Sequence, residues 1–339
     1  MRRLKMTLAG LLACAGVAAL GAGTARAQVP EIRLARQFSM GYLQFNVMDH
    51  EKLIQEHAAK MGIPEVKVTW VKFNGPAAMN DALLSDSVDI VSGSPTGLLT
   101  IWSRTRGTAM EVRAISALSS QPFLLNSSDP EIKTLADVGK CKKIAVPAVK
   151  VSSQAMTVQM IAAKLFGPKE ATRFDSLTVS MSPPDATIAL LSGAGDINCV
   201  FAVPPYMQQQ LLQPGIHTVA NSFDVMGGSN TYTTAYTSAR FRDRNPKLYQ
   251  ALYAAMQDAT DRINADIRKA AQYWITDGES KLSLDFVAGV AGGQQVRWTM
   301  VPERTMMVAE FMHAAGGIKV LPASWKDYFF PEAHNLPGG

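Results

Sequence analysis

The amino-acid sequence predicts an α/β protein built from two doubly wound lobes. Short β-rich runs alternate with longer helical patterns, an order typical of parallel strands with helices on both faces of the sheet. The same alternation begins again near the middle of the chain. In addition, the phrase ALLS, three variable residues and Asp-Ile occurs once in each half, at 82–90 and 189–197. The length of 339 residues suits two domains, and an apolar content of 47% suits two substantial cores.

The N-terminal segment has the parts of a secretory signal. A basic start, MRRLK, precedes the apolar run MTLAGLLACAGVAALGAG, and small residues stand at Ala25 and Ala27. We expect 1–27 to be a signal peptide, cleaved before Gln28, and the mature protein to be exported. Two alternatives stay open: an uncleaved membrane anchor, and a lipid attached at Cys14, for which the preceding apolar run is short.

Removal of the signal changes the charge of the chain. The whole sequence has 33 basic and 28 acidic residues, and the signal holds four basic residues and no acidic ones. The mature chain therefore carries 29 basic and 28 acidic side chains, a formal charge of +1. This balance gives no support to a nucleic-acid or membrane-surface partner, and no second stretch is apolar enough to span a bilayer.

The first half reads as four strands separated by three helices. Val66, Val68 and Trp70 recur at every second position, which indicates a half-buried strand. Gly62 ends the first helix, and a Ser-Pro pair begins the third. This order predicts a mostly parallel sheet. The expected strands are 31–38, 66–73, 88–93 and 111–119, and the expected helices are 46–62, 75–85 and 94–107.

The second half repeats this order. Its clearest helix, 152–167, begins at a Ser N-cap and ends at a Gly-Pro pair. The apolar side chains of that helix have the spacing of one buried face, at Val158, Ile161, Ala162, Leu165 and Phe166. The expected strands are 142–148, 175–181, 196–203 and 217–222, and the expected helices are 133–140, 152–167, 184–193 and 204–215.

Beyond residue 224 the alternation stops. A strand and its connection are expected at 227–241, and a long helix at 245–267 has Asn245 as N-cap and Pro246 in its first turn. The chain up to about residue 318 reads as helices broken by glycines. We expect this part to return and pack on the first lobe, and the final segment, 329–339, to be loose.

The repeated phrase occupies the same place in both halves. In each half, ALLS closes a helix, a short turn follows, and the Asp begins a strand. We interpret it as a shared structural unit; the alternative is coincidence in an Ala- and Leu-rich chain. Asp89 and Asp196 fall at the amino ends of their strands, whereas open α/β sheets bind ligands at the carboxyl ends. These two aspartates are therefore not expected at a ligand site.

Motifs for catalysis are missing from the sequence. It contains no G-x-S-x-G elbow, no Gly-Lys-Ser/Thr phosphate loop, no H-E-x-x-H and no C-x-x-C. His50 and His57 lie two helical turns apart, too far to share one metal ion. We therefore expect no enzyme activity, no metal and no cofactor.

Residues at the carboxyl ends of the expected strands form the candidate ligand site. Most are small neutral donors, which together with the free N–H groups of helix N-termini bind an anion without a full counter-charge. Ser152 and Ser153 are the foremost anion ligands, and Lys150 is the cation of these loops. For each serine the alternative is a plain N-cap, and for each apolar side chain a place in the core. The full set is Gln37, Phe38, Met40, Tyr42, Asn74, Ser94, Pro95, Thr96, Ser119, Ser120, Lys150, Ser152, Ser153, Pro184, Asp185, Pro205 and Tyr206.

Four segments together resemble a known family. In their order and spacing they are similar to the substrate-binding proteins of ABC transporters of the nitrate/sulfonate/taurine type. The resemblance covers roughly residues 30–270, and the last part of the chain matches little. The segments are FNGPAAMNDALLSDSVDIVSGSP (73–95), IKTLADVGKCKKIAVPAVKVSSQ (132–154), PPDATIALLSGAGDINCVFAVPP (183–205) and RFRDRNPKLYQALYAAM (240–256).

The resemblance implies a type II periplasmic binding protein with a ligand cleft between two lobes. The first lobe would comprise 28–122 and 226–339, and the second 123–225. The loops 94–96 and 204–206 would face each other across the cleft, and hinge closure would enclose the ligand. The implied ligand is a small anionic solute: a sulfonate, a taurine-like molecule, an aromatic carboxylate or nitrate. The implied partner is an ABC permease in the inner membrane, served by a monomer in the periplasm.

Two other interpretations stay open. An enzyme on the same fold, as in pyrimidine-synthesising relatives of this family, would need His and Cys side chains clustered near the cleft. A receptor for a different transporter class or for a sensor kinase would share the same fold.

The resemblance also bears on the two cysteines of the mature chain. In the implied second lobe, the strands at 142–148 and 196–203 are parallel neighbours, which brings Cys141 and Cys199 toward disulfide distance. A disulfide bond and two free thiols both stay open.

Overall fold

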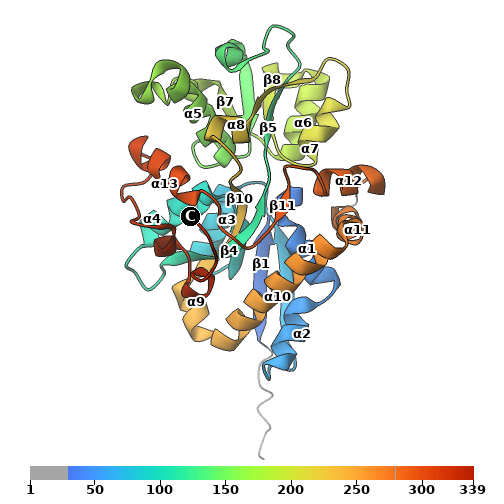
Figure 1. The fold of residues 1–339 in the computed structure, drawn as a ribbon, viewed down its shortest axis with the longest axis vertical. Coiled ribbons are helices and arrows are strands. Elements are labelled where there is room, and N and C mark those ends of the chain that lie inside the picture. Colours follow the sequence, from blue (N-terminus) through green and yellow to red (C-terminus); the bar gives the residue numbers. More distant parts are fainter. Residues whose placement is uncertain (1–29, 279) are drawn as a thin grey trace, which may run out of the picture.

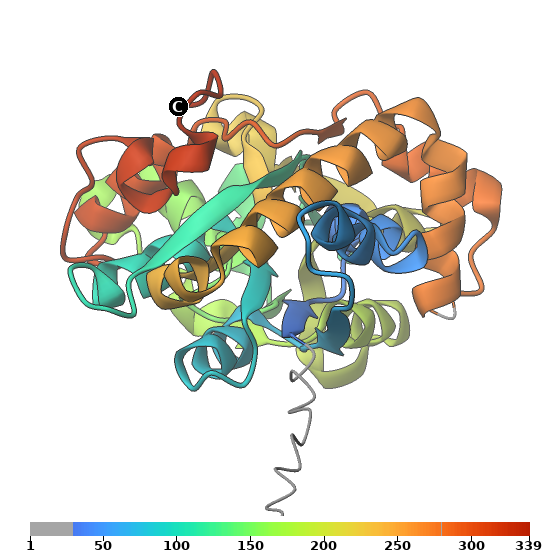
Figure 2. The same ribbon diagram turned by 90° about the horizontal axis from the view of Figure 1, so that it is seen from below.

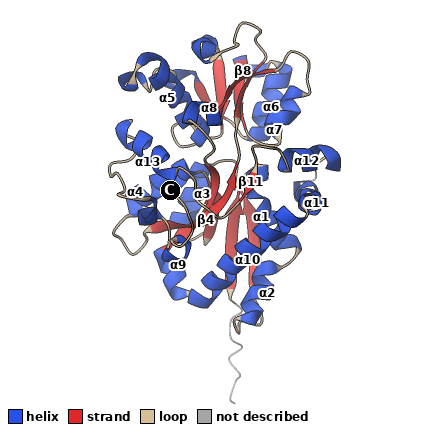
Figure 3. Cartoon of the chain, in the orientation of Figure 1, coloured by secondary structure: helices blue, strands red, loops and turns tan. Residues whose placement is uncertain are grey.

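The computed structural model describes residues 30–278 and 280–339. The expected signal peptide, its cleavage before Gln28 and the alternative lipid site at Cys14 lie outside the described residues. The described chain forms two α/β lobes, one above the other along the long axis of the molecule (Figure 1), with helices around a sheet in each lobe (Figure 3). Within this part of the chain, none of the helices combines the length and apolar character needed to cross a bilayer.

A six-stranded sheet forms the first lobe, in the order β11-β4-β10-β3-β1-β2. β1 pairs in parallel with both β2 and β3. The four strands expected in the first half, β1 to β4, run in the same direction, but β10 lies antiparallel between β3 and β4 and β11 is antiparallel to β4, so the sheet is mixed. β4 ends and β10 begins at the side facing the second lobe, which forces opposite directions. The strands are β1 (Glu31–Arg36), β2 (Lys67–Lys72), β3 (Ile90–Gly93), β4 (Val112–Ser120), β10 (Thr231–Ser238) and β11 (Arg297–Trp298).

Helices cover both faces of this sheet because neighbouring strand residues point to opposite sides. Ile90 packs with one layer of helices, and Val91 with the other. Figure 2 shows α10 beside the blue helices α1 and α2. The first layer is α1 (Leu43–His50), α2 (Leu53–Lys60), α10 (Pro246–Ala265), α11 (Ile267–Gly278) and α12 (Leu284–Ala291); the second is α3 (Pro76–Leu84), α4 (Pro95–Thr105) and α13 (Thr305–Ala314). The short helix α9 (Ala239–Arg244) follows β10.

The single helix expected at 46–62 is two helices in the structure. Lys52 adopts a left-handed backbone conformation with φ 54°, which interrupts the helical path between α1 and α2. His50 and His57 consequently lie on separate helices, where each contacts an aspartate: Asp277 for His50 and Asp258 for His57.

The C-terminal segment is packed, so the expectation of a loose tail at 329–339 is wrong. Phe329 and Phe330 are buried, and the Phe330 N–H donates to the Ala114 carbonyl of β4 at 2.8 Å. The Phe330 ring lies 5.6 Å from that of Tyr249 on α10. Burial of two phenylalanine side chains stabilises this attachment. The expected return of the C-terminal part onto the first lobe is confirmed.

A five-stranded sheet forms the second lobe, in the order β7-β6-β8-β5-β9. β6 pairs in parallel with β7 and β8, as expected. β5 was not predicted; it follows directly after the chain enters this lobe and runs antiparallel to β8 and β9. The strands are β5 (Leu124–Ser127), β6 (Lys143–Val146), β7 (Thr178–Ser180), β8 (Ile197–Ala202) and β9 (His217–Asn221), and the helices are α5 (Ser153–Phe166), α6 (Pro183–Ser192), α7 (Tyr206–Leu211) and α8 (Ser222–Met226).

Cys141 and Cys199 form a disulfide bond inside this lobe. Cys199 belongs to β8, and Cys141 lies just before β6, its parallel neighbour. Both residues are buried. Of the two states that the sequence left open, the structure shows the bonded one.

The repeated ALLS phrase does mark a shared unit. It closes α3 before β3 and α6 before β8, and a residue with positive φ follows each helix: Asp86 at 56° and Gly193 at 69°. The two aspartates of the phrase differ. Asp89 accepts hydrogen bonds from the backbone and guanidinium of Arg33, whereas Asp196 is exposed. Asp89 therefore has a structural role: it holds Arg33 of β1 at the edge of the first sheet that lies away from the second lobe.

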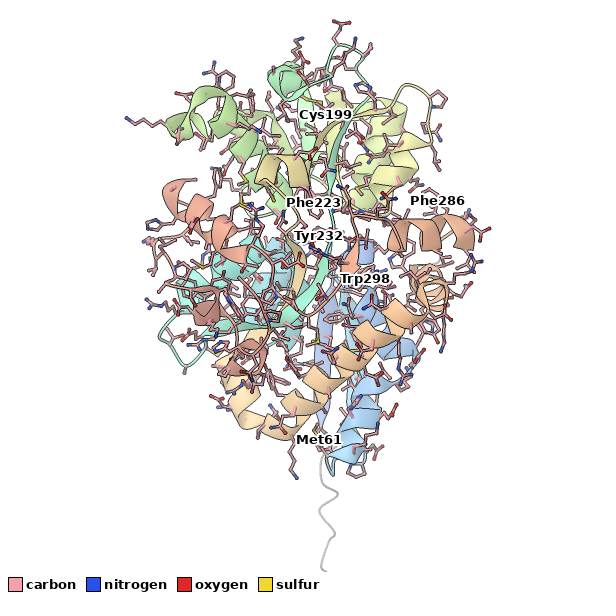
Figure 4. All side chains as sticks on the ribbon, viewed as in Figure 1. Met61, Cys199, Phe223, Tyr232, Phe286 and Trp298 are labelled. Atoms are coloured by element: carbon pink, nitrogen blue, oxygen red, sulfur yellow. A yellow bond between two sulfur atoms is a disulfide. The ribbon has the colours of Figure 1, made fainter. Side chains whose placement is uncertain are left out.

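Aromatic contacts fill the junction where the chain passes between the lobes. The Phe123 ring lies 6.0 Å from Tyr232 in the first sheet and 5.3 Å from Phe201 in the second. Figure 4 shows Tyr232 and Phe223 between the lobes, below Cys199. The lobe boundaries at 122/123 and 225/226 stay a prediction.

Candidate ligand cleft

Direct hydrogen bonds join the two lobes along the junction. Thr96 Oγ1 in the first turn of α4 lies 3.3 Å from Ser153 Oγ in the first turn of α5. The Met40 N–H donates to the Pro204 carbonyl at 2.9 Å, and Ser39 Oγ donates to the same oxygen at 3.3 Å. The loops 94–96 and 204–206 thus both reach the junction, but each meets a different partner from the other lobe.

A small cavity lies between the lobes at this junction; we call it the inner cavity. Its volume is about 20 Å³, space for about one water molecule. It is polar on several sides because the N-termini of α4 and α5 open onto it. Its lining is Gln37, Phe38, Tyr42, Pro76, Ser94, Pro147, Ser152, Gln154, Pro183, Val203 and Tyr232.

The polar groups of the inner cavity differ in how far they are already satisfied. Ser152 Oγ donates to the Ala148 carbonyl at 2.8 Å and accepts from the Ala155 N–H at 3.2 Å, so it does act as an N-cap. The Tyr232 hydroxyl lies 3.1 Å from Ser39 Oγ. Gln154 is only 4% exposed, and its amide has no hydrogen-bond partner within residues 30–278 and 280–339.

A larger space, which we call the outer cleft, adjoins the inner cavity. Its volume is about 330 Å³, and Gln37 and Phe38 line both spaces. The first lobe supplies one wall from β1, α1, β2 and α11, and the second lobe supplies the other from α6 and α7. Its lining is Arg36, Gln37, Phe38, Ser39, Asn46, Lys72, Pro184, Tyr206, Gln209, Trp274, Asp277, Gly278, Ser280, Lys281 and Leu282.

An ion pair in the wall of the outer cleft is balanced within the protein. The Asp277 carboxylate accepts from both terminal nitrogens of Arg36 at 3.3 Å and from Asn46 Nδ2 at 2.5 Å, and it contacts His50 Nε2 at 2.5 Å. Asp277 therefore ties the end of α11 to β1 and α1. Two further cations, Lys72 and Lys281, also line the cleft.

Tyr206 offers a neutral hydroxyl in the same cleft. Burial raises the pKa of the Tyr206 phenol to about 12. The hydroxyl therefore stays protonated, and able to donate, over the whole physiological pH range. Within the described part of the chain, no group of three or more His, Cys, Asp or Glu side chains is arranged to hold a metal ion.

The structure brings seven of the predicted site residues to these two spaces and leaves ten outside them. Thr96 and Ser153 lie beside the inner cavity and bond each other. Ser119 is tied to Thr233 within the sheet at 2.8 Å, and Ser120 Oγ is buried and has no hydrogen-bond partner among the described residues. The seven lining residues are Gln37, Phe38, Tyr42, Ser94, Ser152, Pro184 and Tyr206. Six more of the predicted residues line neither space: Met40, Pro95 and Pro205 are buried, and Asn74, Lys150 and Asp185 are exposed.

Several lining residues were not predicted from the sequence. Arg36 and Gln154 each adjoin a predicted position, so a wider window at each strand end would have found them. Tyr232, Trp274 and Asp277 come from the part of the chain beyond residue 224 and carry no local signal. Only the folding of that part back onto the first lobe places them here.

Two mixed sheets with a cleft between them define the type II periplasmic-binding-protein fold. A comparison with protein-family models matches residues 27–275 to the NMT1-like family. The chain therefore belongs to the NMT1-like family. A search of curated proteins finds no match.

Solved structures with this fold include proteins that bind anions. The alkanesulfonate-binding protein SsuA from Xanthomonas axonopodis pv. citri, bound to MOPS, matches with a TM-score of 0.67 and 18% identity over 91% of this chain and 98% of that one. The periplasmic nitrate-binding protein NrtA from Synechocystis PCC 6803 matches with a TM-score of 0.66 and 16% identity over 91% and 86%. The aliphatic sulphonate binding protein SsuA from Escherichia coli gives 0.62 and 17% over 87% and 95%. The predicted fold and family resemblance are confirmed.

Proposed function

We propose that this protein is the solute-binding component of an ABC importer and binds a small organic anion between its lobes. One observation carries the proposal: the N-termini of α4 and α5, from opposite lobes, meet at an inner cavity lined by Ser94, Ser152 and Gln154, whose side-chain amide has no partner in the described part of the chain. Helix N-termini and neutral donors stabilise an anion without a buried counter-ion.

The closed junction fits the same role. Thr96 and Ser153 touch across the lobes, so movement of one lobe relative to the other would open or close the path to the inner cavity. The similar solved structures include sulfonate-binding and nitrate-binding proteins. We propose that the mature chain acts as a periplasmic monomer and delivers its solute to a membrane permease.

A thermal-shift screen tests the proposal. Nitrate, taurine, alkanesulfonates and aromatic carboxylates are added separately to the mature protein. A solute at a hundred times its dissociation constant stabilises the folded state by about 2.7 kcal/mol, which is a clear rise in melting temperature. The absence of a shift with every anion would contradict solute binding, and slow consumption of a bound solute would favour an enzyme instead.

Gln154 supplies the variant that ties binding to the inner cavity. Gln154→Leu removes an amide that the fold leaves unpaired, so we expect the free energy of unfolding to hold or rise while anion affinity falls at least tenfold. Gln159→Leu is the matched control on the same helix, because Gln159 bonds Asp175 outside both spaces. Equal affinities for the two variants would place the anion elsewhere.

A further inference from the structure

Three aromatic rings from separate elements face the outer cleft. Phe38 follows β1, Trp274 belongs to α11, and Tyr206 begins α7 on the opposite lobe. All three are half-buried, so each keeps part of its ring surface available to a ligand. Apolar contacts of this kind on both walls of one cleft suit a planar, weakly polar body between them.

The two spaces differ in size, so they suit different parts of one ligand. The inner cavity, at about 20 Å³, has room for little more than one oxygen atom or water molecule. The outer cleft, at about 330 Å³, falls at the lower end of the range for small organic ligands, which is about 300 to 1,000 Å³. Gln37 and Phe38 line both, so one molecule can direct a single acid oxygen into the inner cavity and keep its body in the outer cleft.

The polar edges of the outer cleft favour a ring that carries a negative charge at one end. The Tyr206 hydroxyl is neutral, and the Trp274 indole N–H is a donor only. Lys72 Nζ already lies 5.0 Å from the centroid of the Phe38 ring, which shows that a cation and an aromatic face share this space. Asp277 does not oppose an anion with a free charge, because Arg36 balances it.

We propose that the solute is an aromatic acid. Its ring lies in the outer cleft among Phe38, Tyr206 and Trp274, and one oxygen of its carboxylate or sulfonate is directed to the inner cavity at Ser152 and Gln154. This proposal rests on the proposed function as a solute-binding protein and narrows the class of solute.

Matched pairs of acids test the ring. Isothermal titration compares benzoate with cyclohexanecarboxylate, and benzenesulfonate with cyclohexanesulfonate; nitrate and acetate serve as ring-free anions. Each pair keeps charge and approximate size and changes only the aromatic character. We expect the aromatic member of at least one pair to bind about tenfold more tightly than its saturated partner.

The possible outcomes separate the two proposals. If saturated acids, nitrate or acetate bind as tightly as the aromatic acids, the aromatic class is wrong and solute binding stands. If no anion binds at all, both proposals are wrong.

A ring-specific variant gives a second readout. Trp274→Leu keeps an apolar side chain and removes the ring, so it should weaken the aromatic acid at least fivefold and leave its saturated partner within twofold. Phe166→Leu is the control, because Phe166 is an exposed ring on α5 outside both spaces. An equal loss for both acids in Trp274→Leu would overturn the assignment of the ring to this cleft.

Discussion

Thr96 Oγ1 lies 3.3 Å from Ser153 Oγ, and this contact joins the first turns of two helices that belong to different lobes. Both hydroxyls are buried. Ser94 Oγ lies 2.7 Å from Thr96 Oγ1, so the contact is part of a short chain of hydroxyls beside the inner cavity. The pair therefore reports directly on whether the lobes are closed.

A double-mutant cycle on this pair should show coupling in solute affinity. Ser153→Ala or Thr96→Val removes one hydroxyl and leaves its partner without the cross-lobe bond, so each should weaken solute binding about three- to tenfold. The double variant should be no worse than either single one, because the same bond is lost. Additive losses, measured by titration calorimetry, would show that the hydroxyls act independently of lobe closure.

Lys150 should not contribute to solute affinity. It is exposed, adopts a left-handed backbone with φ 64°, and lines neither the inner cavity nor the outer cleft. We expect Lys150→Ala to keep the dissociation constant within twofold of the wild type. A loss of solute affinity of tenfold or more would show that Lys150 is an anion ligand after all. Lys247→Ala, an exposed lysine at the start of α10, is the control for general charge effects.

The disulfide bond should stabilise the second lobe. The bond joins residues separated by 58 positions, so it restricts the unfolded chain over a long loop. Replacement of Cys141 and Cys199 by Ala should lower the free energy of unfolding by about 2–4 kcal/mol, measured by urea denaturation. Thiol titration of the oxidised mature protein under denaturing, non-reducing conditions should find no free thiol. Two reactive thiols would contradict the bond.

Gly228 should stabilise the second crossing between the lobes. Its φ is 141°, and an added Cβ would lie 2.7 Å from Arg304 Nη1, whose guanidinium donates to the Met226 and Gly227 carbonyls. Gly228→Ala therefore adds backbone strain and displaces the end of the Arg304 side chain from these carbonyls, and we expect a loss of about 1–3 kcal/mol in stability.

Gly215→Ala is the control for Gly228, because Gly215 also has a positive φ, of 88°, but open space around its Cβ position. We expect Gly228→Ala to be the more destabilising of the two and also to weaken solute binding. Equal effects in chemical denaturation would mean that contact with Arg304 adds nothing at this crossing.

Stability should fall in alkaline solution. Burial raises the pKa of Tyr206 to about 12, and it raises the pKa of Tyr232 and Tyr236 further. An unfolded tyrosine ionises near pH 10, so above about pH 10 the unfolded state loses protons that the folded state keeps. The contribution is complete below about pH 10 and is lost as the pH rises toward the folded-state pKa. Denaturation series from about pH 8 to about pH 12 should show this decline, with a shallower slope for Tyr206→Phe.

Local patterns predicted most elements of the fold, because helix and strand signals lie within a few neighbouring residues. The helix at α5 follows from its Ser N-cap, its apolar face and its Gly-Pro stop, and the structure places it at Ser153–Phe166. The prediction of a single helix at 46–62 is wrong because Lys52 adopts a left-handed backbone conformation, which its residue type does not predict. β5 is only four residues long and pairs with strands far along the chain, so its neighbours in sequence do not reveal it.

The candidate site was predictable only where it depends on strand ends. Gln37, Ser94 and Ser152 were found because an open α/β sheet presents its ligand site at the carboxyl ends of strands. The same rule also selected Ser119, but its hydroxyl forms a hydrogen bond with Thr233 inside the sheet and lines neither the inner cavity nor the outer cleft. Whether a strand-end side chain faces a cavity or a neighbouring strand depends on pairing, and the pairing of β4 with β10 joins residues more than a hundred positions apart.

The sequence by itself determined the α/β class, the two related lobes and the family resemblance, because these rest on local periodicity, capping and the order of motifs. Only the tertiary structure decided which side chains meet. It placed Trp274 and Asp277 of α11 in the same cleft as Arg36 of β1 and Phe38 just after that strand, and it brought Tyr206 there from the other lobe. Such contacts depend on how buried helix faces pack and on how the chain crosses twice between the lobes. Neither can be predicted from the residues that neighbour a position in the sequence.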